Sequence, residues 1–86
     1  MHVKIRLFGR LHDLAGATDL DREVRPGATV EDVWRQLADE IPAMAPYSRS
    51  ISAAVNADFA RMSVPVAEGD EVAFLPPVSG GGVQGG

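Results

Sequence analysis

The chain has 86 residues and a formal net charge of −4, with 45% hydrophobic and 23% charged residues, which is the composition of an ordinary globular protein with a single core. It contains no cysteine, so disulfides, thiolate nucleophiles and cysteine-ligated zinc or iron–sulfur sites are excluded, and its acidic balance argues against nucleic-acid binding. Its apolar runs are too short to span a membrane, and its first residues alternate in polarity, unlike a signal peptide, so we expect a cytoplasmic protein.

The first half of the chain predicts two strands and two helical segments. Residues 2–8 alternate between polar and apolar side chains, which is the pattern of a half-buried strand. Residues 11–16 predict a short helical turn closed by glycine, and residues 19–25 predict a polar strand at a sheet edge. Residues 29–41 have the apolar spacing of one helical face and begin with a capping box, and Pro42 ends this main helix.

The second half predicts three further strands, one of them short. Residues 42–50 are expected to form a loop, residues 51–56 a strand, residues 59–62 a short segment after a turn, and residues 71–75 the last strand. Pro65 keeps its neighbours at an edge or in a loop, because proline cannot donate to a sheet ladder. The order predicts an α+β domain with a mixed sheet of four to five strands and one main helix on one face.

The C-terminus is rich in glycine: five of the eight residues from Ser79 onward are Gly. Glycine loses the most entropy on ordering, so we expect residues 79–86 to be a flexible tail on a domain of residues 1–78. The tail formally matches the dinucleotide-binding pattern GxGxxG, but that motif needs a following helix that this chain lacks room for. From composition alone, an idle terminus remains an equal alternative.

A functional interpretation of the tail has a chemical basis. A terminal carboxylate can be adenylated by ATP and then converted into a thiocarboxylate, which is a sulfur nucleophile that needs no cysteine. An enzyme that does this must enclose the terminus in a narrow, water-excluding channel. Glycine passes through such a channel without side-chain obstruction.

The residues that carry a family resemblance run from Glu68 to Gly81, where GDEVAF is followed by Leu75 and PPVSGG, together with Val55-Asn56, Pro65-Val66 and, near the start, Phe8 and Leu14-Ala15-Gly16. This pattern resembles the MoaD/ThiS group of sulfur carriers, in particular the small subunit of molybdopterin synthase, over residues 1–81. The resemblance implies a ubiquitin-like β-grasp fold. It also implies a non-catalytic, sulfur-carrying subunit with no bound cofactor.

The resemblance further implies the partners and the chemical species. An E1-like adenylating and sulfurtransferase enzyme would form a transient acyl-adenylate and then a C-terminal 1-thioglycine. The tail would next enter the large subunit of molybdopterin synthase, in a heterotetramer, and supply the dithiolene sulfurs of molybdopterin.

The working terminus has two candidates. The chemistry requires a free carboxylate, which in this sequence belongs to Gly86, preceded by Gly85. The family pattern stops at a glycine pair that matches Gly80-Gly81, and the extension adds up to roughly 17 Å of reach. We expect Gly86 to be the working end, with Gly81 after trimming as the alternative.

A second functional signal comes from three apolar side chains, those of Phe8, Phe59 and Leu75, that alternation or a turn places at the surface. Single exposed apolar residues are common, but a cluster near the tail would make a docking patch, and in the family the matching positions contact partner enzymes. The predicted partner-binding residues are Phe8, Phe59, Leu75, Pro76, Pro77, Val78 and Ser79. His2 and His12 have no second ligand at metal spacing, so we expect no metal site.

Three other functions remain open from the sequence. The chain could donate sulfur in another pathway, such as thiamine or cysteine synthesis, because the activation step is shared. It could instead be a ubiquitin-like modifier that forms isopeptides with lysine. A function of a different class is a non-catalytic β-grasp binding module whose tail is only a linker.

Overall fold

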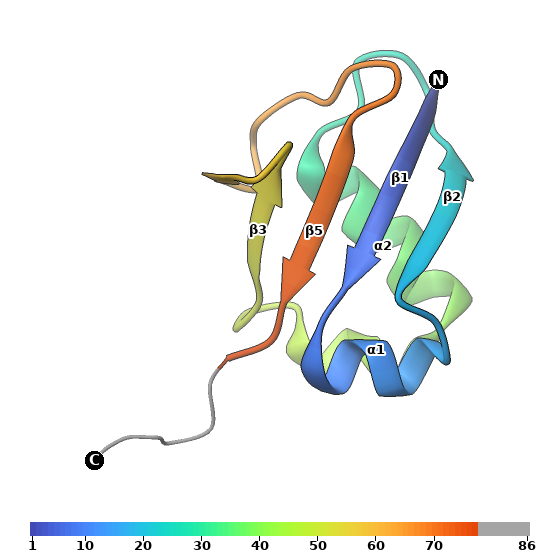
Figure 1. The fold of residues 1–86 in the computed structure, drawn as a ribbon, viewed down its shortest axis with the longest axis vertical. Coiled ribbons are helices and arrows are strands. Elements are labelled where there is room, and N and C mark those ends of the chain that lie inside the picture. The colour runs from blue at the N-terminus through green and yellow to red at the C-terminus, as the bar shows by residue number, and fades with distance from the viewer. Residues whose placement is uncertain (78–86) are drawn as a thin grey trace.

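The computed structural model describes residues 1–77, which form one sheet with a helical layer (Figure 1). The elements in chain order are β1 (His2–Leu7), α1 (Gly9–Ala15), β2 (Asp19–Glu23), α2 (Val30–Glu40), the 3₁₀ helix η1 (Pro42–Tyr47), β3 (Ser52–Val55), β4 (Asp58–Ala60) and β5 (Glu71–Leu75). Within residues 1–77, none of the helices has the length and apolar character that a membrane crossing requires.

The five strands form one mixed sheet in the order β2-β1-β5-β3-β4. The two central strands, β1 and β5, are parallel, while β2, β3 and β4 join the sheet by antiparallel pairing. α2 packs on one face of the sheet, and the other face is open (Figure 1). The predicted α+β architecture is therefore confirmed, including β2 as an edge strand.

Alternation along the central strands decides which face becomes the core. Val3, Ile5 and Leu7 of β1 are buried, as are Val72 and Phe74 of β5. Residues two apart in a strand share a face, so each strand buries one row of apolar side chains under α2. The intervening residues of both strands lie on the open face.

The start of α2 is fixed by the predicted capping box. The Asp32 backbone N–H donates to the Thr29 hydroxyl at 3.2 Å, and the Thr29 backbone N–H donates to the Asp32 carboxylate at 2.9 Å. The second of these bonds is the main cause that lowers the pKa of the Asp32 carboxyl below its ordinary value. Two of the N–H groups that a helix terminus leaves without partners are satisfied in this way.

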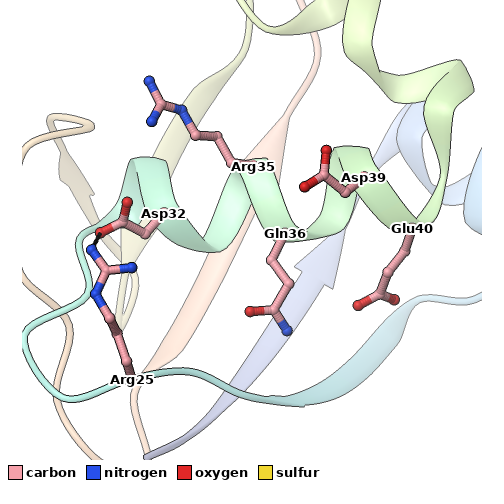
Figure 2. Close-up of a pocket in the computed structure, with 6 residues that line it drawn as sticks. All are labelled: Arg25, Asp32, Arg35, Gln36, Asp39 and Glu40. Carbon is pink, nitrogen blue, oxygen red and sulfur yellow. Dashed lines mark hydrogen bonds and ion pairs between the residues drawn. The ribbon is translucent and has the colours of Figure 1, made fainter.

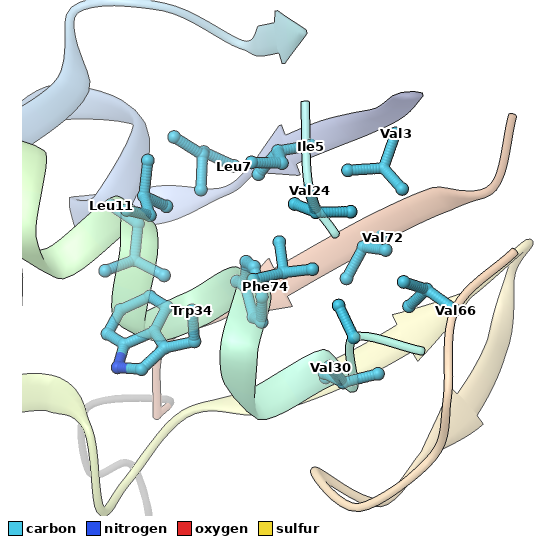
Figure 3. Close-up of a cluster of buried hydrophobic side chains, with 14 of the residues drawn as sticks. Val3, Ile5, Leu7, Leu11, Val24, Val30, Trp34, Val66, Val72 and Phe74 are labelled. Carbon is cyan, nitrogen blue, oxygen red and sulfur yellow. The ribbon is translucent and has the colours of Figure 1, made fainter. Parts of the chain in front are cut away.

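The core lies between α2 and the sheet (Figure 3). The rings of Trp34 and Phe74 meet edge to face, with centroids 5.1 Å apart and an interplanar angle of 63°, which is a favoured aromatic geometry. The Trp34 indole N–H donates to the Ser48 hydroxyl at 2.9 Å, so its polar atom is satisfied. Trp34 is therefore part of the core.

The structure corrects one predicted element. Residues 42–47 form a 3₁₀ helix rather than part of a loop. The short turn buries Met44 completely, and it brings Ser48 under the Trp34 indole. Six residues that include two prolines are too few to show a helical period in the sequence, whereas burial of one methionine against the core is a tertiary effect.

Candidate functional site

One row of paired residues crosses the open face of all five strands. Asp19 of β2 pairs with Arg6 of β1, and Arg6 pairs with Ala73 of β5. Ala73 then pairs with Ala54 of β3, which pairs with Phe59 of β4. Directly opposed residues in a sheet share a face, so the row runs from acid to base, across two alanines, to an aromatic ring.

This row creates an apolar groove, because two short side chains lie between two long ones. The groove has a volume of about 310 Å³, and its lining residues are Arg6, Phe8, Ala54, Ala57, Phe59, Glu71, Ala73 and Leu75. Phe59 is 82% exposed and Phe8 is 42% exposed, while Leu75 is half-buried. The three apolar residues that the sequence placed at the surface thus lie together along one groove.

Arg6 closes the polar end of the groove. Its guanidinium contacts the carboxylates of Asp19 and Glu71, each at 3.1 Å. The hydrogen bond with Glu71, followed by the charge of Asp19, raises the pKa of Arg6 above its ordinary value. The Arg6 Cζ atom also lies 6.0 Å from the centroid of the Phe8 ring, within the range of a cation–π contact. These contacts hold the guanidinium beside the exposed ring.

A second groove connects this surface to the end of β5. It has a volume of about 650 Å³ and is lined by Phe8, Gly9, Arg10, Tyr47, Leu75, Pro76 and Pro77. Phe8 and Leu75 line both grooves. The apolar surface therefore continues from Phe59 to Pro77, and in the sequence only Val78 separates Pro77 from the glycine-rich tail.

The start of α1 packs closely on this exit. Gly9 has a φ of +55°, and a Cβ atom there would lie 3.0 Å from Cγ of Pro76. Proline has a fixed φ and also restricts the residue before it. The chain therefore leaves the sheet after Leu75 and follows a restricted path through Pro76 and Pro77 beside α1.

The turn between β3 and β4 sets the position of Phe59. Asn56 and Ala57 have φ values of 51° and 75°, so both occupy the left-handed region that suits a tight hairpin turn. The Asn56 side-chain amide donates to Asp70 at 2.9 Å, and its carbonyl accepts from the backbone N–H of Glu71 at 3.0 Å. These bonds tie the hairpin to the start of β5.

The structure therefore brings together Phe8, Phe59, Leu75, Pro76 and Pro77 of the predicted partner-binding residues. Val78 and Ser79 of that set, and the candidate termini Gly80-Gly81 and Gly85-Gly86, lie outside the described residues, as does the domain boundary after residue 78. Ala54 and Ala73, which form the floor of the groove, were not predicted from the sequence. An alanine in the outward position of each strand was the available signal.

A third hollow, separate from the two grooves, lies over the outer face of α2 and is polar (Figure 2). Its lining residues are Arg25, Asp32, Arg35, Gln36, Asp39 and Glu40. Arg25 contacts Asp32 at 3.2 Å, and Arg22 contacts Glu40 at 2.7 Å. The charges in these pairs are already compensated, which is typical of a solvated helix face.

The two histidines make local contacts with carboxylates. His2 lies 3.5 Å from Asp21, and His12 lies 3.4 Å from Asp13. In the part of the chain that the structure describes, no three histidine or carboxylate side chains gather as a metal site would require. The apolar groove and its continuation to Pro77 are therefore the candidate functional site.

Comparison with known proteins relates the chain to a family. A profile described as "ThiS family" matches residues 5–81. The chain is 35% identical over 81 residues to the molybdopterin synthase sulfur carrier subunit of Escherichia coli, covering 92% of this chain and 99% of that protein. It is 32% identical over 83 residues to the protein of the same name from Chlamydomonas reinhardtii, covering 94% of this chain and 100% of that protein.

Solved structures agree with this relationship. The crystal structure of SAMP1 from Haloferax volcanii matches with a TM-score of 0.81 and 32% identity, over 94% of this chain and 100% of that one. The ubiquitin-like β-grasp fold that the resemblance implied is confirmed.

Proposed function

Because this chain belongs to the ThiS family, together with sulfur carrier subunits of molybdopterin synthase, we propose that it carries sulfur as a C-terminal thiocarboxylate for molybdopterin synthesis. The observation that supports this proposal is that, in a chain of this family, the apolar groove leads toward the root of the C-terminal tail. An exposed apolar surface leads from Phe59 to Pro77, and in the sequence only Val78 separates Pro77 from the glycine-rich tail.

The groove has the properties of a surface that a partner protein covers. It is apolar at its centre, it contains an aromatic side chain that the domain leaves exposed, and it is bounded by the charged pair of Arg6 and Glu71. Interfaces commonly have such an apolar centre and polar rim. A partner seated on this groove would have the root of the tail at its margin and could receive the terminus in its own active site.

The chemistry lies in the tail. The terminal carboxylate oxygen attacks the α-phosphorus of ATP, pyrophosphate leaves, and the acyl-adenylate forms. A hydrosulfide ion (HS⁻) delivered from the sulfur donor then attacks the acyl carbon, the C–O bond to AMP breaks, and AMP leaves with the bonding electron pair. The resulting thiocarboxylate is a nucleophile that needs no cysteine in this chain.

Two partners follow from this chemistry. The first is an E1-like adenylating and sulfurtransferase enzyme, and the second is the large subunit of molybdopterin synthase, with a heterotetramer as the assembly. We place both reactions in the cytoplasm, because adenylation consumes ATP. In this scheme the chain has no bound cofactor and is not itself a catalyst, and the working terminus is Gly86, with Gly85 before it, or Gly81, with Gly80 before it.

Intact mass spectrometry tests the proposal. After incubation with the activating enzyme, ATP and a sulfur donor, the mass of the chain should rise by one exchange of oxygen for sulfur. A variant that ends at Ser79 keeps every residue of the described domain and is the matched control, for which no rise is expected. An unchanged mass of both the full chain and a chain that ends at Gly81, or an equal rise in the control, would refute the proposal.

A second candidate function is covalent modification of proteins. This chain is 32% identical to SAMP1 from Haloferax volcanii. It is 31% identical to a second solved structure, which is described as small archaeal modifier protein 1. A modifier would use the same adenylate but transfer the acyl group to a lysine amine. Digestion of proteins from cells that express the chain would then yield peptides with a glycine remnant on lysine, whereas a dedicated sulfur donor would yield none.

A further inference from the structure

Phe8 combines a fixed backbone with a partly exposed side chain. Its carbonyl accepts hydrogen bonds from the backbone N–H groups of Leu11 and His12, at 3.1 and 3.4 Å, in the first turn of α1, so the main chain at this residue is held in place. Its ring is 42% exposed, and a phenyl side chain has no donor or acceptor that could fix its rotamer by hydrogen bonding. The orientation of the ring therefore depends on the side chains beside it.

The Phe8 ring stands where the two apolar grooves meet. Phe8 and Leu75 are the residues that line both the groove toward Phe59 and the groove toward Pro77. Leu75 belongs to β5 and is held by the sheet, whereas Phe8 follows the end of β1. Another Phe8 rotamer would change the shape of both grooves, so a partner that covers them together needs this ring in one orientation.

Arg6 lies beside the Phe8 ring and is held from two sides. β1 lies between β2 and β5 (Figure 1), and the Arg6 guanidinium contacts Asp19 of β2 and Glu71 of β5, each at 3.1 Å. A guanidinium presents its donors in a rigid planar fork, so two carboxylates on neighbouring strands restrict its orientation. Its Cζ atom lies 6.0 Å from the centroid of the Phe8 ring, a distance at which a cation is attracted to the face of an aromatic ring.

We propose that Arg6 is a positioning residue for partner docking: held by Asp19 and Glu71, it orients the Phe8 ring so that the two grooves form one docking surface. This role rests on the proposed function, because the orientation of the ring matters only if a partner covers it. Ordering a side chain during association costs affinity, and a side chain that is ordered beforehand avoids that cost. Loss of the guanidinium should therefore weaken binding through Phe8, without any contact between Arg6 and the partner.

Asp19 extends the same role beyond the grooves. It lines neither groove, yet it provides one of the two contacts that hold Arg6. Asp21 lies two residues further along β2, on the same face of the sheet, and its carboxylate is 3.5 Å from His2. Both aspartates are exposed and carry the same charge, and they differ in that Asp19 contacts Arg6. A comparison of the two therefore separates positioning of Arg6 from a general effect of charge.

A double-mutant cycle tests the role of Arg6. The Kd for the activating enzyme is measured by isothermal titration calorimetry for the wild type, Arg6→Gln, Phe8→Ala and the double variant. Arg6→Gln should raise the Kd roughly 2- to 12-fold, the equivalent of ordering one side chain at an interface, and should have no further effect once Phe8 is alanine. Lys4→Gln is the matched control, because it removes the same charge from an exposed position on the same face of β1, and it should bind like the wild type.

Three results would overturn the positioning role. An equal rise in Kd on Arg6→Gln with and without the Phe8 ring would show that Arg6 contacts the partner directly. A lower free energy of unfolding with an unchanged Kd would show that Arg6 only stabilises the sheet. An equal rise in Kd for Lys4→Gln would show that the effect is one of overall charge.

The aspartate pair provides an independent measurement of the same Kd. Asp19→Ala should raise the Kd in the same direction as Arg6→Gln, but by a smaller factor because Glu71 still holds the guanidinium. Asp21→Ala should leave the Kd unchanged. Equal effects of the two substitutions would contradict the positioning role.

ATP–pyrophosphate exchange with the activating enzyme separates this inference from the proposed function. The effect of Arg6→Gln should appear in the KM for the chain rather than in kcat, since the reacting terminus is unchanged. Exchange by the wild type and by Arg6→Gln with the same KM would overturn the positioning role and leave the proposed function intact. No exchange by the wild type, either as the full chain or ending at Gly81, would overturn the proposed function and the positioning role with it.

Discussion

Replacement of Phe59 by alanine should weaken partner binding strongly and leave folding almost unchanged. The side chain is 82% exposed, and a phenylalanine buries about 150–250 Å² when it is covered, so a partner can cover roughly 120–200 Å² of it. At about 25 cal/mol per Å² of apolar surface, complete coverage contributes about 3–5 kcal/mol. Because alanine retains part of this contact, we expect a loss of about 2–4 kcal/mol, which raises Kd roughly 30- to 1000-fold.

The cost to folding should be small for the same reason. Most of the Phe59 ring has no intramolecular contact to lose, so the free energy of unfolding should fall by at most about 1 kcal/mol. Isothermal titration calorimetry with the two proposed partners, the activating enzyme and the large synthase subunit, measures the Kd, and urea denaturation measures the free energy of unfolding. Arg35→Ala removes a long exposed side chain from the outer face of α2 (Figure 2), and should bind both partners like the wild type.

Two outcomes would contradict this reasoning. A Phe59→Ala chain that binds both partners within about threefold of the wild-type Kd would show that the groove is not the docking surface. An equal loss for Arg35→Ala would show that the effect is not specific to the open face. In the first case the exposed ring would have no role in docking, as is common for apolar residues at protein surfaces.

Three further predictions concern stability, each measured by urea denaturation. Thr29→Ala removes the capping hydroxyl and should lower the free energy of unfolding by about 1 kcal/mol, whereas Thr29→Ser should restore most of it. Ala57→Gly should raise the free energy of unfolding by about 0.5–1 kcal/mol, because relief of the backbone strain at φ 75° exceeds the entropy cost of glycine. A lower free energy of unfolding would contradict this expectation. The pKa values of Asp32 and Glu40 are lowered, mainly by hydrogen bonds from the Thr29 backbone and from Arg22. The two carboxylates therefore contribute to the free energy of unfolding at neutral pH, and this contribution should be lost as the pH falls below about 5. In Glu40→Gln the free energy of unfolding should fall less steeply with pH. A fall as steep as in the wild type would exclude Glu40 as a source of the pH dependence.

Much of the fold could be predicted because its signals are local. The alternation in residues 2–8 identified β1 and its buried face, and the interval between Thr29 and Asp32 identified the capping box that begins α2. The last strand was predicted with the bounds that the structure gives, Glu71–Leu75. In each case the residues that carry the pattern lie within a few positions of one another. The 3₁₀ helix was missed because what stabilises it, burial of Met44 under the core, depends on distant residues.

The candidate site divides in the same way. The sequence indicated that Phe8, Phe59 and Leu75 would be accessible, since each falls where alternation or a turn points outward. It did not indicate that Ala54 and Ala73 would lie between Phe59 and Arg6, because these residues come from four different strands. Only the register of the sheet puts them in one row.

The sequence by itself determined the strands and the two α-helices, the buried face of β1 and the chemical identity of the glycine-rich end, because these depend on the order of residues along the chain. The tertiary structure decided that two alanines lie between an arginine and a phenylalanine, that the resulting groove leads to Pro77, and that Gly9 packs against Pro76. The physical reason is that strand register brings together side chains that are far apart in the sequence, and no periodicity within a single segment encodes that pairing.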